Sequence, residues 1–80
     1  MNHEESKVKD IYIAALLKVM GFKLAGMEQQ DQVTYFIYED KEKVQDFLNR
    51  EYFTDSVKVN AKELFDTVRE MKQRIKTFTF

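Results

Sequence analysis

The chain has 80 residues, enough for one domain with a single hydrophobic core. Its 13 basic and 14 acidic residues give a formal net charge of −1, which argues against a strongly basic nucleic-acid coat but not against a local basic patch. The absence of cysteine excludes a disulfide framework and a thiolate metal site. No signal peptide and no apolar run of the roughly 20 residues that a membrane span requires are present, so we expect a cytoplasmic protein without membrane contact.

The first helix is expected over residues 8–20, after a polar, disordered tail at residues 1–7. Nine of the ten residues in 11–20 are apolar, and Lys18 is the exception. A surface helix normally keeps a polar back. This helix must therefore be covered on most sides, either as a central core helix or with one face on the core and another on a partner. Gly21 suits the left-handed conformation that often ends a helix.

Two strands are expected next, at residues 22–28 and 33–39, joined by a turn at residues 29–32. The second strand is the strongest β signal in the chain, because β-branched and aromatic residues follow one another without a break. Alternate residues face opposite ways: Val33, Tyr35 and Ile37 on one face, Thr34, Phe36 and Tyr38 on the other. Since both faces are apolar, this strand should be central or should carry a partner on one face.

A second helix is expected over residues 41–52, with Asp40 as its N-cap. Residues 57–59 form a candidate third strand. The third helix begins with a capping box, in which Asn60 is the N-cap and Glu63 lies three residues later. Its apolar stripe consists of Ala61, Leu64, Phe65, Val68, Met71 and Ile75.

Residues 76–80 are expected to form a loose tail or a short strand. The predicted element order is α-β-β-α-(β)-α. Such an order is typical of an α+β fold, here a small antiparallel sheet of two or three strands packed with three helices in one domain, residues 1–80.

No residue pattern predicts catalysis. His3 is the only histidine and lies in the expected tail, where a catalytic base would be poorly positioned. Ser6 and Ser56 lie outside any strand-turn-helix elbow, and no glycine-rich phosphate loop is present. Three carboxylates follow the second strand: Glu39, Asp40 and Glu42. They suit helix capping and the helix dipole better than a cation site. We therefore expect no enzyme, no cofactor and no metal.

Two groups of residues are candidates for binding. The aromatic residues exceed what one small core accommodates, and we expect the anchors of a protein interface to be Tyr12, Tyr35 and Phe36. The simpler alternative is that the tyrosines only cover the edge of the core. The basic residues Arg69, Lys72, Arg74 and Lys76 close the third helix. They would either contact phosphates of DNA or RNA or simply favour a helix C-terminus.

Three parts of the chain carry a family resemblance: residues 10–24, the aromatic strand with its acidic end at 33–40, and residues 59–65 with 69–72 of the last helix. Together they resemble a family of small domains of unknown function found in phages and mobile elements of Gram-positive bacteria. The resemblance implies a stand-alone α+β domain in a mobile-element context, without an assigned activity or site residue. The leading hypothesis is a non-enzymatic protein–protein interaction or self-association module; the alternative is a DNA- or RNA-binding accessory protein.

Overall fold

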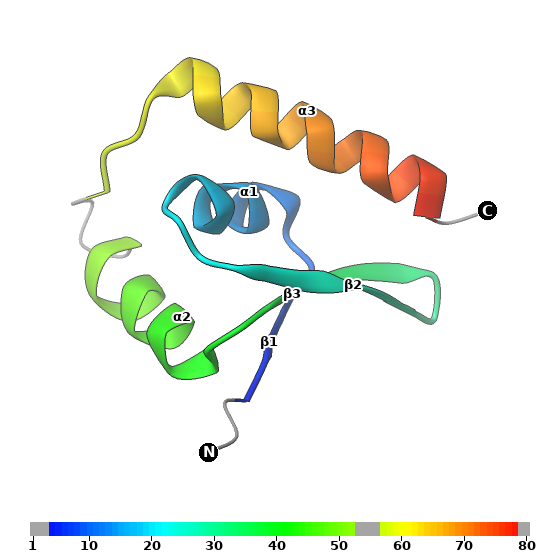
Figure 1. Ribbon diagram of the computed structural model, residues 1–80, viewed down its shortest axis with the longest axis horizontal. Helices are drawn as coiled ribbons and strands as arrows, with labels where there is room; N and C mark the ends of the chain where they lie inside the picture. Colours follow the sequence, from blue (N-terminus) through cyan, green and yellow to red (C-terminus); the bar gives the residue numbers. More distant parts are fainter. Residues whose placement is uncertain (1–3, 53–56, 79–80) are drawn as a thin grey trace.

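A three-stranded antiparallel sheet with helices packed on it forms the part of the chain that the computed structural model describes, residues 4–52 and 57–78. The elements follow in the order β1 (Ser6–Val8), α1 (Ile11–Val19), β2 (Leu24–Gln30), β3 (Val33–Tyr38), α2 (Lys41–Phe47), the π-helical turn η1 (Leu48–Tyr52) and α3 (Ala61–Phe78). Figure 1 shows α1 and α3 on the same side of the sheet. The predicted α+β class is confirmed.

The central strand is β3, as its apolar sequence predicted, and the sheet order is β1-β3-β2. Directly paired residues of an antiparallel sheet share a face. The pairs Val8↔Phe36 and Met27↔Phe36 point to the helices, and the pair Lys7↔Ile37 points away from them. The sheet therefore has an inner face that carries the core and an outer face on the opposite side.

The third strand is β1 rather than residues 57–59, which are not in a strand. The prediction of a disordered tail up to residue 7 and of a helix from residue 8 is wrong for residues 6–8. A strand of three residues is stabilised by pairing with β3 more than by its own β-propensity. The Lys41 amide also donates to the Glu4 carbonyl at 2.7 Å, which ties the start of β1 to α2.

Each helix begins at a side-chain cap. Asp10 Oδ1 accepts from the amides of Tyr12 at 2.8 Å and Ile13 at 3.1 Å, so α1 begins at residue 11. Asp40, at φ +64°, caps α2 as predicted. Asn60 Oδ1 accepts from the Glu63 amide at 3.0 Å, which confirms the cap of α3.

The C-terminal ends of the helices agree less well with the prediction than their N-terminal caps do. Gly21 has φ +95° and ends α1 as predicted. The predicted second helix, residues 41–52, is α-helical up to Phe47 and continues as the π-helical turn η1. Residues 76–78 form the last turn of α3 instead of a loose tail or a strand, and residues 79–80 lie outside the described chain.

The centre of the molecule is α1, which lies between the sheet and α3 (Figure 1). Four consecutive residues of α1 are buried: Ala14, Ala15, Leu16 and Leu17. The Tyr38 hydroxyl donates a hydrogen bond to the Ala14 carbonyl from the sheet side. From the other side, α3 contributes the buried Val68 and Met71. The structure thus shows α1 as a central core helix, on which Tyr12 remains exposed at one side.

Replacing Met71 with alanine should lower the free energy of unfolding by about 2–5 kcal/mol, because a fully buried side chain would leave a cavity between α1 and α3. Urea denaturation measures this loss. The exposed Gln73→Ala on the same helix is the control and should change stability by less than about 0.5 kcal/mol. Equal effects of the two substitutions would contradict this packing.

Burial raises the pKa of Tyr38 above the ordinary tyrosine value of about 10. Unfolded chains would therefore lose this proton at a lower pH than folded ones, so folding is favoured below pH 10 and loses that stabilisation as the pH rises further. Between about pH 9 and about pH 11, the wild type should lose on the order of 1 kcal/mol more stability than Tyr38→Phe. Urea titrations of both proteins across this range test the difference, and parallel curves would contradict it.

Candidate functional site

The three predicted anchor residues lie in three different places. Tyr12 is on α1 and is 62% exposed. Tyr35 is half-buried on the outer face of the sheet. Phe36 is fully buried in the core, at 0% exposure, so its prediction as a surface contact is wrong for this fold. The alternation of β3 turns Phe36 to the inner face together with Tyr38, whereas Tyr35 faces outward.

The predicted basic cluster is divided between two sides of α3. Successive residues of an α-helix are separated by about 100° around the axis. This rotation places Arg69, Lys72 and Lys76 on one side of the helix. Arg74 lies on the other side of the buried stripe, where its Nη2 atom is 3.4 Å from Glu70 Oε1. Three of the four cations therefore share a surface.

An exposed aromatic ring lies on the same side of α3 as these three cations. Phe65 is 62% exposed, although the sequence pattern included it in the apolar stripe. It is about 100° of helix rotation from the centre of the buried stripe around Val68 and Met71, so its ring falls at the margin of the packed face. The spacing of Phe65 to Arg69 and Lys72, four and seven residues, is the signal that sequence reasoning missed.

Tyr12 of the neighbouring helix α1 lies next to this side of α3. Lys72 Nζ lies 5.8 Å from the centre of the Tyr12 ring, within the range of a cation–π contact. Lys18, further along α1, approaches Glu70 on the opposite side of α3, at 3.9 Å. Hence α1 passes beneath α3 and shows Tyr12 on one side only. We call the surface formed by Tyr12, Phe65, Arg69, Lys72 and Lys76 the α3 flank.

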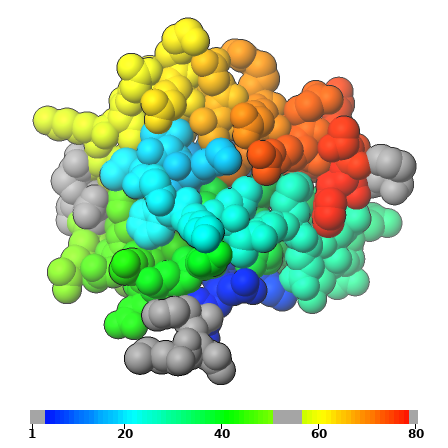
Figure 2. Space-filling model, viewed as in Figure 1, coloured from blue at the N-terminus to red at the C-terminus, as the bar shows by residue number. Residues whose placement is uncertain are grey.

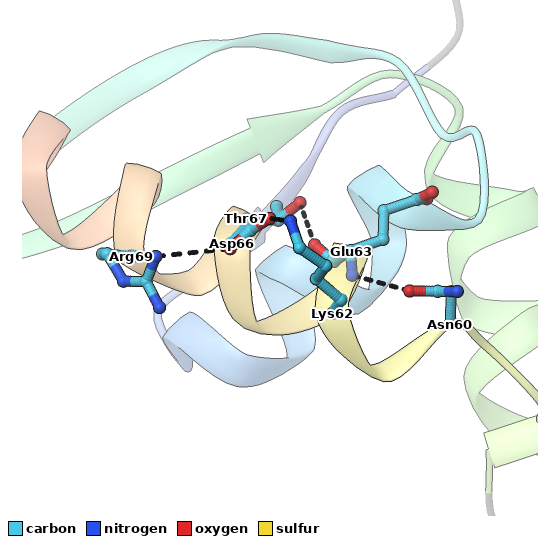
Figure 3. A network of polar contacts seen from close by, with 6 residues as sticks. All are labelled: Asn60, Lys62, Glu63, Asp66, Thr67 and Arg69. Atoms are coloured by element: carbon cyan, nitrogen blue, oxygen red, sulfur yellow. Dashed lines mark hydrogen bonds and ion pairs between the residues drawn. The ribbon is translucent and has the colours of Figure 1, made fainter.

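Asp66 neutralises the beginning of the α3 flank (Figure 3). Its carboxylate is 2.9 Å from Lys62 Nζ and 3.3 Å from Arg69 Nη1. The hydrogen bond and the charge of Lys62, followed by the charge of Arg69, lower the pKa of Asp66. Exposed pairs of this kind contribute little to stability, but they reduce the positive charge that Lys62 and Arg69 present to a ligand.

The far end of the flank keeps its positive charge. Within residues 4–52 and 57–78, no carboxylate lies within ion-pair distance of Lys72 or Lys76. Ile75, between them in sequence, lines a shallow hollow that it shares with Val33 and Thr34 of the β2–β3 hairpin. Figure 2 likewise shows the orange and red half of α3 lying over this hairpin. The exposed cations are thus held on a packed helix.

Two of the acidic residues after β3, Glu39 and Asp40, line one hollow together with Lys23 and Lys43. Glu39 approaches Lys23 at 3.9 Å, while Asp40 caps α2 and lies 3.8 Å from Lys43. Glu42 is in the first turn of α2, as the dipole interpretation predicted. Among the described residues, no group of three histidine, cysteine or carboxylate side chains is arranged to hold a metal ion. His3 and Ser56 lie outside the described part of the chain, and Ser6 is buried in β1.

Another hollow lies along α2 and η1 and is lined by these two elements and the cap residue Asp40. Charged side chains in it form pairs along the same stretch of chain, such as Arg50 Nε with Asp46 Oδ1 at 2.9 Å. The ionisable groups of this hollow all come from one continuous stretch of chain, residues 40–50. No helix of the described chain has the length and apolar character required to cross a membrane.

A family model described as a domain of unknown function, DUF5659, matches residues 3–78. The chain belongs to this family. The match includes all the strands and helices given above, from β1 to α3, so the DUF5659 domain coincides with the α+β unit. Comparisons with curated proteins and with solved structures found no match.

Proposed function

We propose that this DUF5659 domain is a non-enzymatic protein-interaction module of a phage or another mobile element, and that the α3 flank is its contact surface. The observation that carries the proposal is the exposure of Tyr12 and Phe65 beside cations without a carboxylate partner in the described chain. The partner would be a cytoplasmic protein of the host or of the element. Its surface would combine acidic side chains with a pocket for an aromatic ring.

The two kinds of side chain on the flank have different roles in this proposal. Aromatic rings supply much of the affinity of protein interfaces, because they bury a large area at a small cost in conformational entropy. The cation–π contact with Lys72 restricts the Tyr12 ring in the free protein, so the ring would lose less conformational entropy on binding. The cations would accelerate and orient the encounter with an acidic partner.

The proposal assigns no catalytic residue and no cofactor to the domain. General acid–base catalysis requires a titratable group held within hydrogen-bond reach of a bound substrate. The ionisable side chains around the hollow along α2 and η1 instead belong to one stretch of chain, and Arg50 pairs there with Asp46. The α3 flank itself is an open surface of a helix and offers contact without a cleft.

Replacing Tyr12 with alanine should weaken partner binding by roughly 10- to 30-fold, as expected for the loss of an interface anchor. Its melting temperature should change little, because the ring is mostly exposed. Affinity capture from host lysate, with and without nuclease, would supply the protein partner, and calorimetric titration would then compare the variants.

Met20→Ala is the matched control for this experiment, since Met20 is an exposed apolar residue just after α1 and outside the α3 flank. It should bind like the wild type. Wild-type affinity of Tyr12→Ala for the captured partner would contradict the assignment of the contact surface.

A second candidate function is binding of single-stranded nucleic acid, which the same flank favours for a different reason. Bases stack on exposed rings, and phosphates pair with cations along the strand. Phe65 and Tyr12 would be the stacking rings, and Lys72 and Lys76 would contact phosphates. The salt dependence of binding distinguishes this candidate from a protein contact dominated by the rings.

Lys72→Glu should abolish such binding, and Arg74→Glu should retain it, although both substitutions change the net charge equally. The reason is that Arg74 lies on the other side of α3 and pairs with Glu70. Fluorescence anisotropy of a labelled oligonucleotide at several salt concentrations measures both variants. Absence of wild-type binding at micromolar protein and low salt would remove this candidate.

A further inference from the structure

The shallow hollow between Ile75 and the β2–β3 hairpin differs from other hollows of the molecule in its charge. Its lining comes from the link between β1 and α1, from the hairpin and from α3. The lining residues are Lys9, Gln29, Gln32, Val33, Thr34 and Ile75, and we call this site the hairpin hollow. None of them is a carboxylate, whereas three other hollows of the described chain each contain at least two carboxylates. The hairpin hollow is therefore the positively charged one of the four.

Neutral hydrogen-bonding side chains form half of this lining. Gln29 and Thr34 pair across the hairpin, so both lie on the inner face of the sheet, and Gln32 lies in the turn between the strands. Each amide group and the threonine hydroxyl can both donate and accept a hydrogen bond. In the part of the chain that the structure describes, these three side chains make no hydrogen bond to another residue. Their polar groups are therefore available to a ligand.

Three cations lie in or beside the hairpin hollow. Lys9 lines it, is exposed, and has no carboxylate within ion-pair distance among the described residues. Lys72 and Lys76 are within one helical turn of the α3 residue that lines the hollow. Asp10 and Asp31 are close in sequence but do not line the hollow, and the Asp10 carboxylate accepts from the first amides of α1. The local charge is therefore positive, although the whole chain carries −1.

We propose that the hairpin hollow binds an acidic peptide segment of the partner protein. This inference rests on the proposed function and specifies which part of the partner the domain takes. Carboxylates of the segment would lie against Lys9, Lys72 and Lys76, and its main-chain amides would bond to the glutamine side chains. Tyr12, which contacts Lys72, is three residues after Lys9, so the hollow continues the α3 flank toward the hairpin.

The chemistry of the hollow favours a peptide over a strand of nucleic acid. Both ligands are anionic, and cations without a carboxylate partner attract both. Bases of a single strand stack on aromatic rings, but no aromatic residue lines the hairpin hollow. The glutamine amides instead match the donor and acceptor groups of a peptide main chain. A segment rich in glutamate or aspartate is therefore the expected occupant.

Nuclear magnetic resonance titration of the isotope-labelled domain at low salt locates the site. Decaglutamate is the acidic probe, decaglutamine the neutral control, and an oligothymidylate of the same length the nucleic-acid control. Decaglutamate should shift the side-chain amide signals of Gln29 and Gln32. It should leave the signal of Gln45 unchanged, because Gln45 lines a hollow that contains three carboxylates. Decaglutamine should shift none of these signals.

Lys9→Glu should weaken the binding of decaglutamate roughly tenfold, because a repulsive charge then replaces an attractive one in the hollow. Lys9→Gln should weaken it roughly threefold, and this milder variant keeps the test decisive if the charge reversal disturbs the fold. Circular dichroism confirms the fold of each variant.

Lys58→Glu is the matched control, because Lys58 is also exposed and has no ion-pair partner in the described chain. It precedes the start of α3, which is about 20 Å from Ile75 along the helix axis. This variant changes the net charge as much as Lys9→Glu does and should bind decaglutamate like the wild type. Equal weakening by the two reversals would overturn the proposal.

Two results of the titration would also overturn it. One is that decaglutamate at millimolar concentration leaves the Gln29 and Gln32 signals in place. The other is that oligothymidylate shifts the same signals at a lower concentration than decaglutamate does, which would assign the hollow to nucleic acid.

Failure of this proposal can be distinguished from failure of the proposed function, because Lys9 is not part of the α3 flank. If Tyr12→Ala loses the captured partner while Lys9→Glu binds both the partner and decaglutamate normally, the flank keeps its assignment and the hollow loses it. If Lys9→Glu loses decaglutamate while Tyr12→Ala binds the partner like the wild type, the hollow keeps its assignment and the flank loses it.

Discussion

The fold depends on one constraint, which is the need to bury a helix that is apolar on nearly all sides. Four consecutive residues of α1 are buried, so no single layer covers it. The sheet covers one side and α3 the other. Ala14 and Ala15 are small, which allows the backbone of α1 to come close enough for the Tyr38 hydroxyl to reach the Ala14 carbonyl. The arrangement of the two covering layers follows from this central helix.

The position of α1 also determines which surfaces remain uncovered. The contact of α3 with α1 is a narrow stripe that includes Val68 and Met71. Phe65 and three cations of α3 therefore lie outside this contact. The inner face of the sheet is used by the core, and the hollow beside Ile37 on the outer face is lined by Glu5 and residues of the strands. A chain of this size has too few elements to cover both faces of its sheet and both sides of α3. The exposed α3 flank is a consequence of that shortage.

Local signals in the sequence predicted local structure well. The caps Asp40 and Asn60, the helix end at Gly21 and the central strand β3 each depend on residues close together in the chain, and each is confirmed. The strand β1 was not predicted, because a three-residue edge strand has almost no pattern of its own and depends on a partner 30 residues away. The turn between β2 and β3 is formed by Asp31 and Gln32, both at positive φ and without the glycine that would have indicated it.

The candidate surfaces were harder to predict, because exposure depends on tertiary packing. Phe36 and Tyr35 are adjacent in a strand, and only the choice of the inner face separates a core residue from a surface one. Phe65 and Val68 are three residues apart and both fit the apolar periodicity of a helix, but only Val68 is buried. The basic cluster appeared continuous in sequence, whereas the helix turn moves Arg74 to the opposite side. Periodicity alone therefore identified the right residue types at the end of α3 but not the surface they form.

The net charge of −1 does not show that two surfaces of the molecule differ in how their charges are paired. On the α3 flank, Asp66 balances Lys62 and Arg69, while Lys72 and Lys76 have no carboxylate counterpart in the described chain. A ligand for this surface must therefore bring negative charge of its own. On the outer face, Lys7 and Glu28 balance each other but lie on opposite edges, two strand spacings or about 10 Å apart in the backbone. Their side chains meet across β3 at 2.7 Å, so these two charges are balanced within one chain, whereas those of Lys72 and Lys76 are not.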